Sequence, residues 1–162
     1  MPRRPPLRRL GVVACSLTLL VPAACSGTLA VDSPARSGPD ARACAALVET
    51  LPRRVADQPE RPVDPGDGFA AAWGDPAIEL RCGVPTPKGL DRFAACQDAN
   101  GVGWFIPEEQ QTGGSVPITM TTVGRAQNVE VRIPADYFPP VNTMVDLAPA
   151  LKRTIREVRP CV

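Results

Sequence analysis

Six cysteines are the residues of this sequence whose type is best suited to chemistry. No two of them form a CxxC pair, and their spacings match no zinc-binding pattern, so we expect neither a metal nor a redox cofactor. Cysteines pair as disulfides in an oxidising compartment, so the location of the protein determines whether these cysteines form disulfides. Their positions are Cys15, Cys25, Cys44, Cys82, Cys96 and Cys161.

The first 24 residues have the pattern of an export signal. Four arginines and no acidic residue precede the apolar run LGVVACSLTLLVPAA. The run ends in small residues. The run is too short for a typical bilayer-spanning helix, so a retained membrane anchor is the less favoured reading. We therefore predict a signal peptide over residues 1–24.

The stretch VPAACSG, residues 21–27, resembles the lipobox of bacterial lipoproteins. The resemblance implies that the thiol of Cys25 receives a diacylglyceryl group and that cleavage occurs just before it. Pro22 departs from the lipobox pattern, which usually has Leu, Val or Ile there. The alternative is ordinary cleavage near Ala23 or Ala24, which would give a secreted protein without lipid.

Cysteine parity favours lipidation. If Cys15 is removed with the signal and Cys25 carries lipid, four cysteines remain, an even set suited to two disulfides. Four cysteines allow three pairings. We predict the pair of Cys82 with Cys96 and the pair of Cys44 with Cys161, the second of which would join the ends of two predicted helices. Such a long closed loop stabilises a fold by ~3–5 kcal/mol.

Catalytic chemistry finds few candidates. The sequence has 0 histidines, which excludes Ser-His-Asp and Cys-His sites and the HExxH metalloprotease site. A carboxylate pair could hydrolyse envelope polymers, but adjacent residues of an extended chain point to opposite sides. We therefore expect no enzyme, and we keep as the alternative a hydrolase that uses Asp75, Glu108 and Glu109. The acidic candidates are Asp64, Asp67, Asp75, Glu108 and Glu109.

Four aromatic residues form the candidate binding surface: Trp73, Trp104, Tyr137 and Phe138. Tryptophans could line a groove for sugar or peptide, although they more often fill a core. Nucleic acid is not an expected partner. Residues 25–162 carry a net charge of −3, and no basic stripe with interleaved aromatics occurs.

The first half of the expected domain combines one helix, a long loop and one strand. Residues 25–39 are small and polar and predict a flexible tether behind the lipidated cysteine. Asp40 can cap a helix that ends at Pro52. Residues 53–68 predict a loop, and 77–84 alternate as a strand.

The second half supplies the remaining strands and a final helix. Residues 91–100 are ambiguous between a helical turn and a strand. Asn100-Gly101 predicts a tight turn into a buried strand, and 117–123 with 128–134 predict a hairpin. The last helix is expected to start at Asp146 with Pro149 in its first turn, and its buried stripe is predicted as Leu151, Ile155 and Val158.

These elements predict one α+β domain over residues 40–162. Its expected core is a small antiparallel sheet of about four strands, with the N-terminal and C-terminal helices packed on one face and the disulfides as staples.

Five segments carry a further resemblance: CAALVETLP, AAWGDPAIELRCGVP, CQDANGVGWFIPEE, TVGRAQNVEVRIP and the closing cysteine. Together they resemble an actinobacterial family of small exported proteins, catalogued as a domain of unknown function, number three-five-one-five. The resemblance implies a location in the cell envelope and attachment to the membrane, and it supplies no catalytic residues. We accordingly expect a non-enzymatic module on the outer face of the cytoplasmic membrane, held through Cys25, with an envelope protein or a cell-wall component as its partner.

Overall fold

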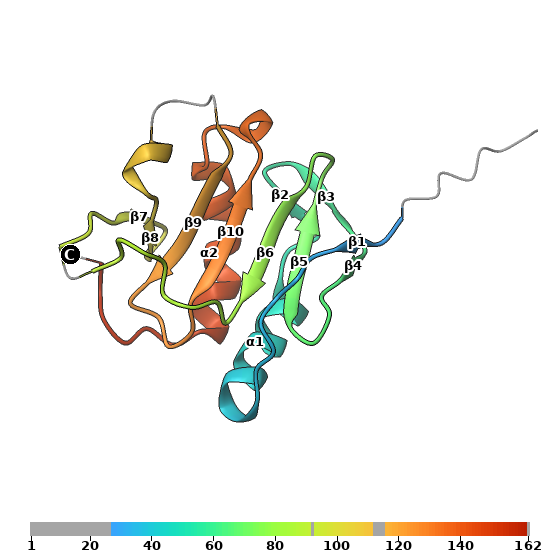
Figure 1. Ribbon diagram of the computed structural model, residues 1–162, viewed down its shortest axis with the longest axis horizontal. Coiled ribbons are helices and arrows are strands. Elements are labelled where there is room, and N and C mark those ends of the chain that lie inside the picture. The colour runs from blue at the N-terminus through green and yellow to red at the C-terminus, as the bar shows by residue number, and fades with distance from the viewer. Residues whose placement is uncertain (1–26, 92, 112–115, 162) are drawn as a thin grey trace, which may run out of the picture.

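The computed structural model describes residues 27–91, 93–111 and 116–161, which form helices packed behind one large sheet (Figure 1). Two α-helices, two short 3-10 helices and ten strands lie within these ranges. In chain order they are β1 Leu29–Ala30, α1 Gly38–Thr50, β2 Arg54–Val55, β3 Gln58–Arg61, β4 Val63–Asp64, β5 Phe69–Trp73, β6 Ile78–Cys82, β7 Gln97–Ala99, β8 Val102–Phe105, η1 Glu108–Gln110, β9 Ile118–Val123, β10 Val129–Ile133, η2 Ala135–Tyr137 and α2 Val141–Thr154.

Eight of these strands form a single sheet in the order β2-β3-β5-β6-β10-β9-β8-β7. All its neighbours are antiparallel, while β1 and β4 make a separate parallel pair beside it. The predicted hairpin is confirmed, because β9 and β10 pair with Val131 opposite Met120. The α+β class is confirmed as well.

One face of the sheet is apolar and carries the helices. Along β10, Val129, Val131 and Ile133 are buried, whereas Glu130 and Arg132 are not, as the alternation predicts. The helices α1 and α2 contact each other and share one apolar cluster with the central strands. Leu151 and Ile155 are buried as expected, but Val158 is 47% exposed and does not belong to the buried stripe.

The sheet is larger than the expected four strands in part because the stretch predicted as a loop, 53–68, contains its strands β2 and β3. Strand β4 lies in the same stretch but pairs with β1 outside this sheet. The usual Asn-Gly hairpin signal is absent there. Instead, Ala56 and Asp57 take positive φ values of 47° and 62° in the turn between β2 and β3. Strand β5 adds another, with an alanine-rich sequence of low β propensity that is nonetheless paired along its length with β6.

The turn at Asn100-Gly101 is confirmed, with φ values of 54° and 77° that suit a two-residue hairpin between β7 and β8. The predicted start of the last helix is wrong. Helix α2 begins at Val141, directly after Pro140, so Asp146 lies inside it rather than at its cap. The Asp146 carboxylate instead accepts a hydrogen bond from the backbone N–H of Ala56 at 2.8 Å.

The disulfides join Cys44 to Cys82 and Cys96 to Cys161, with Cα–Cα distances of 5.6 and 6.0 Å. The predicted pairing is therefore wrong. In the sheet, β6 and β7 are four positions apart, ~19 Å at the usual strand spacing, so Cys82 and Cys96 lie beyond disulfide reach. Cys44 faces inward from α1 and lies against the end of β6 instead.

The chain is ordered well before Asp40, where the predicted tether was expected to end. β1 pairs with β4, and Val31 and Ser33 are only 2% and 4% exposed. In Figure 1 this segment crosses in front of β5 on its way to α1. Among the described residues, no helix has the length and apolar character needed to cross a membrane.

A candidate ligand cavity under the C-terminal tail

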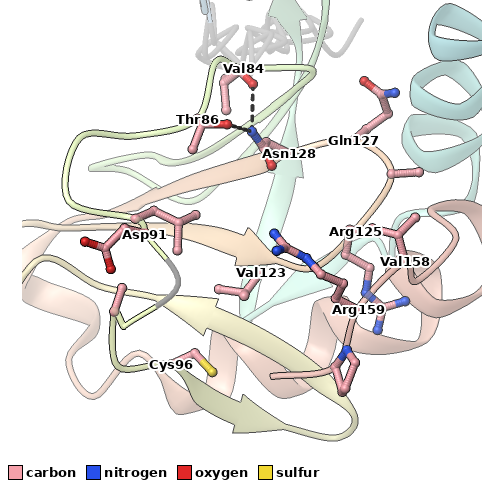
Figure 2. A pocket seen from close by; sticks show the side chains of 15 residues that line it. Val84, Thr86, Asp91, Cys96, Val123, Arg125, Gln127, Asn128, Val158 and Arg159 are labelled. Atoms are coloured by element: carbon pink, nitrogen blue, oxygen red, sulfur yellow. Dashed lines mark hydrogen bonds between the residues drawn. The ribbon is translucent and has the colours of Figure 1, made fainter. Parts of the chain in front are cut away.

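A cavity of about 560 Å³ lies where the β9–β10 turn, the loop after β6 and the last residues of the chain meet (Figure 2). Its volume falls within the range of small-molecule sites, about 300–1,000 Å³. Three parts of the chain distant in sequence build its walls: the described residues of the connection from β6 to β7 (84–91 and 94–96), residues 123–128 and residues 158–160. The cavity therefore depends on how the C-terminal tail, residues 155–161, is held.

Backbone contacts fix the tail against the β9–β10 turn. The carbonyl of Gly124 accepts hydrogen bonds from the N–H groups of Val158 at 2.7 Å and Arg159 at 3.0 Å, and Ala126 donates to the carbonyl of Arg156 at 2.8 Å. Gly124 has a φ of +67°, and a Cβ built on it would lie 1.9 Å from the Arg159 carbonyl oxygen. Only glycine permits this close approach.

The buried side chain of Arg125 anchors the C-terminal tail. Its side chain is 3% exposed, and it donates to the carbonyl oxygens of Ile155 at 3.1 Å and Gly101 at 2.7 Å. It also forms an ion pair with the half-exposed carboxylate of Glu157 at 3.2 Å. One side chain thus joins the end of α2, the β7–β8 turn and the tail.

The disulfide between Cys96 and Cys161 closes the tail's far end. Gly103 of β8 lies directly beneath it, since a Cβ there would be 2.6 Å from the Cβ of Cys161. The sulfur of Cys96 lines the cavity. The bond therefore holds a cavity wall, in addition to closing a loop with a sequence separation of 65.

On the opposite wall, Asn128 organises the loop after β6. Its side-chain amide donates to the carbonyl of Val84 at 3.3 Å and to the hydroxyl of Thr86 at 3.2 Å (Figure 2). The backbone carbonyl oxygen of Asn128 accepts a hydrogen bond from the N–H of Gly83 at 2.8 Å. These hydrogen bonds join this wall to the ends of β6 and β10.

Two arginines at the cavity differ in what they can bind. The guanidinium of Arg125 donates hydrogen bonds to backbone carbonyls, and Figure 2 shows the side chain turning away from the cavity. The exposed Arg159 extends toward the cavity, and no described residue accepts a hydrogen bond from its side chain. A free guanidinium at a cavity wall recognises carboxylate or phosphate groups.

The cavity carries few acidic groups on the residues that the structure describes. Its described lining contains one carboxylate, that of Asp91, which accepts a hydrogen bond from the N–H of Phe93 at 2.7 Å. Across the described ranges, no group of three or more Cys, Asp or Glu side chains is arranged to hold a metal ion. The arrangement can bind a ligand by charge, amide and apolar contacts.

The acidic residues singled out from the sequence are not brought together. Asp75 lies in the β5–β6 turn and pairs with Arg61 at 3.5 Å, while Glu108 and Glu109 are exposed in η1 after β8. Strands β6 and β8 are three positions apart, ~14 Å across the sheet. Asp64 is exposed at the end of β4, and Asp67 is exposed on the connection from β4 to β5.

The predicted aromatic surface does not exist as one surface. Trp73 and Trp104 are 0% exposed and belong to the core, and the indole N–H of Trp73 donates to the Pro52 carbonyl at 2.9 Å. Tyr137 is half-buried in η2, and Phe138 is 46% exposed beside it. Neither lines the cavity.

Sequence reasoning missed the cavity because most of its residues belong to connections, strand ends or the chain end, where no local pattern indicates a ligand. Residues 85–89 (PTPKG) and 124–127 (GRAQ) follow a predicted strand or join two of them, so the sequence indicates only connections there. No local signal marks Arg159. Cys25, the predicted lipidation site, lies outside the described residues.

A comparison with protein families matches the chain to the family described as "Protein of unknown function (DUF3515)", over residues 10–160. Neither the curated proteins nor the solved structures contain a match to the chain.

Proposed function

This chain belongs to the DUF3515 family, and we propose that it is a lipid-anchored, non-enzymatic module of the cell envelope that binds an acidic ligand in the cavity under its C-terminal tail. The observation that carries the proposal is the guanidinium of Arg159, which no described residue pairs, at the wall of a cavity of about 560 Å³. The ligand presents a carboxylate or a phosphate group.

The envelope location is supported by two features. The export signal and VPAACSG point to lipidation at Cys25 on the outer face of the cytoplasmic membrane. The two disulfides suit an oxidising compartment. Cell-wall components and envelope proteins both carry acidic groups, so they are the partners with matching chemistry.

The anchor is tested in cells with the full chain and the Cys25→Ser variant. Incorporation of labelled fatty acid and recovery in the membrane fraction should both be lost in the variant. Recovery of the wild type in the medium without lipid would overturn the anchor in favour of plain secretion.

Ligand binding is tested by calorimetry or NMR titration of the Cys25→Ser protein with soluble cell-wall muropeptides and with inorganic phosphate. Arg159→Gln should weaken binding at least 10-fold, because it removes the charge-assisted hydrogen bond. Arg156→Gln is the matched control, since Arg156 stands on the same tail but does not line the cavity. Equal effects of the two variants, or no binding of either probe, would overturn the proposed site.

A further inference from the structure

The N-terminal segment, residues 29–36, is bound to the domain from its first residues. The N–H of Leu29 donates to the carbonyl of Pro62 at 3.0 Å, and that of Val31 to the carbonyl of Asp64 at 2.9 Å. These bonds make the parallel β1–β4 pair. Val31 is 2% exposed, so its side chain is part of the packed interior.

Ser33 gives the N-terminal segment a second attachment to the domain. Its hydroxyl donates to the carbonyl of Phe69 at 3.0 Å, and the residue is 4% exposed. A Cβ built on Gly68 would lie 2.2 Å from the Ser33 carbonyl oxygen, so glycine at 68 is what lets the two backbones meet. The segment therefore docks in a site shaped for it.

This docking shortens the chain available between Cys25 and the domain. Residues 26–28 alone separate Cys25 from Leu29, and four Cα–Cα steps span at most ~14 Å. A free tether reaching to residue 39 would instead extend to ~50 Å.

We infer that the lipidated protein is held directly against the membrane by its β1–β4 edge, within about 14 Å of the lipid surface. This inference rests on the proposed lipidation of Cys25. The surface that meets the lipid headgroups surrounds β4 and the connection to β5, and its occupant is the membrane itself.

The orientation of the domain on the membrane determines which side the cavity faces. In Figure 1 the described chain enters the domain at the right, next to β1 and β4, and the end of the C-terminal tail lies at the left, toward the opposite end of the long axis. A domain of this size is ~35–40 Å across. The cavity under the C-terminal tail therefore faces away from the lipid and is open to ligands from the wall side.

The inference is tested with the full-length lipoprotein in vesicles that contain a headgroup-labelled energy acceptor. A fluorescent amino acid replaces either Asp67, exposed beside β4, or Gln127, at the cavity. Transfer should be strong from position 67 and at least two-fold weaker from position 127. Equal transfer from both would show a domain that lies flat and would overturn the orientation.

Two variants then change the tether. Twelve Gly and Ser residues inserted after Ser26 give a free chain with a typical end-to-end distance of ~20 Å, so transfer from position 67 should fall. Gly68→Ala should lower it too, by displacing Ser33. Gly27→Ala is the matched control, because its Cβ meets nothing within 4 Å, and it should change nothing.

The outcomes separate the two proposals. Unchanged transfer in the insertion variant, with all variants still membrane-bound, would overturn the short tether and leave the anchor intact. Loss of membrane binding in the wild type would overturn the anchor itself.

Discussion

Replacing Arg125 by methionine should destabilise the domain by about 3–5 kcal/mol. The side chain is 3% exposed and donates to two backbone carbonyls, those of Ile155 and Gly101. Methionine fills much of the same volume but donates nothing. Each carbonyl left without its charged donor costs ~1–3 kcal/mol, and the tail loses its attachment to the end of α2.

The ion pair with Glu157 should contribute little of this. The Glu157 side chain is 49% exposed, so solvent screens the pair, and Glu157→Gln should cost less than about 1 kcal/mol. Arg132→Met, at an exposed arginine on β10, should stay within about 0.5 kcal/mol.

The assay is urea and thermal unfolding of the Cys25→Ser protein with both disulfides formed. For a domain of this length the Arg125→Met loss corresponds to a fall in Tm of ~10 °C or more. A loss below about 1 kcal/mol would refute the assignment of Arg125 as the hydrogen-bonding anchor. A Glu157→Gln loss as large as that of Arg125→Met would show that the ion pair, and not the carbonyl contacts, holds the tail.

Three further predictions test the same structure. Non-reducing peptide mapping should recover Cys96 joined to Cys161, and any other partner for Cys96 would contradict the fold. The double variant Cys96→Ser, Cys161→Ser should lower the free energy of unfolding in urea by ~4 kcal/mol, because the unfolded chain is no longer closed into a loop. Trp73→Phe should cost ~1–3 kcal/mol by leaving the Pro52 carbonyl without its indole donor, and a loss equal to zero in thermal melts would argue against that bond. Gly124→Ala should raise the hydrogen-exchange rate of the tail amides at least 10-fold, because its Cβ meets the tail's backbone; unchanged protection would mean that the tail docks otherwise.

The sequence by itself determined the elements whose signals are local. Alternation of Val131 and its neighbours set the face of β10, and Asn100-Gly101 set a hairpin because that dipeptide readily takes positive φ. Both helices are expected from the sequence, although α1 begins at Gly38 and so contains the predicted cap Asp40, and α2 starts five residues before Asp146. The α+β class follows from these pieces together.

Tertiary structure decided what depends on distant partners. The β2–β3 hairpin has no local glycine signal, and its turn residue Ala56 is bound by Asp146 of α2. Disulfide pairing depends on sheet order, which places Cys82 next to α1 and far from Cys96. The cavity also depends on tertiary structure, because Arg159 lines it only when the C-terminal tail packs against the β9–β10 turn. Composition indicated that residues 29–36 should be free, but burial of Val31 and Ser33 holds them, because a matching site exists only in the folded domain.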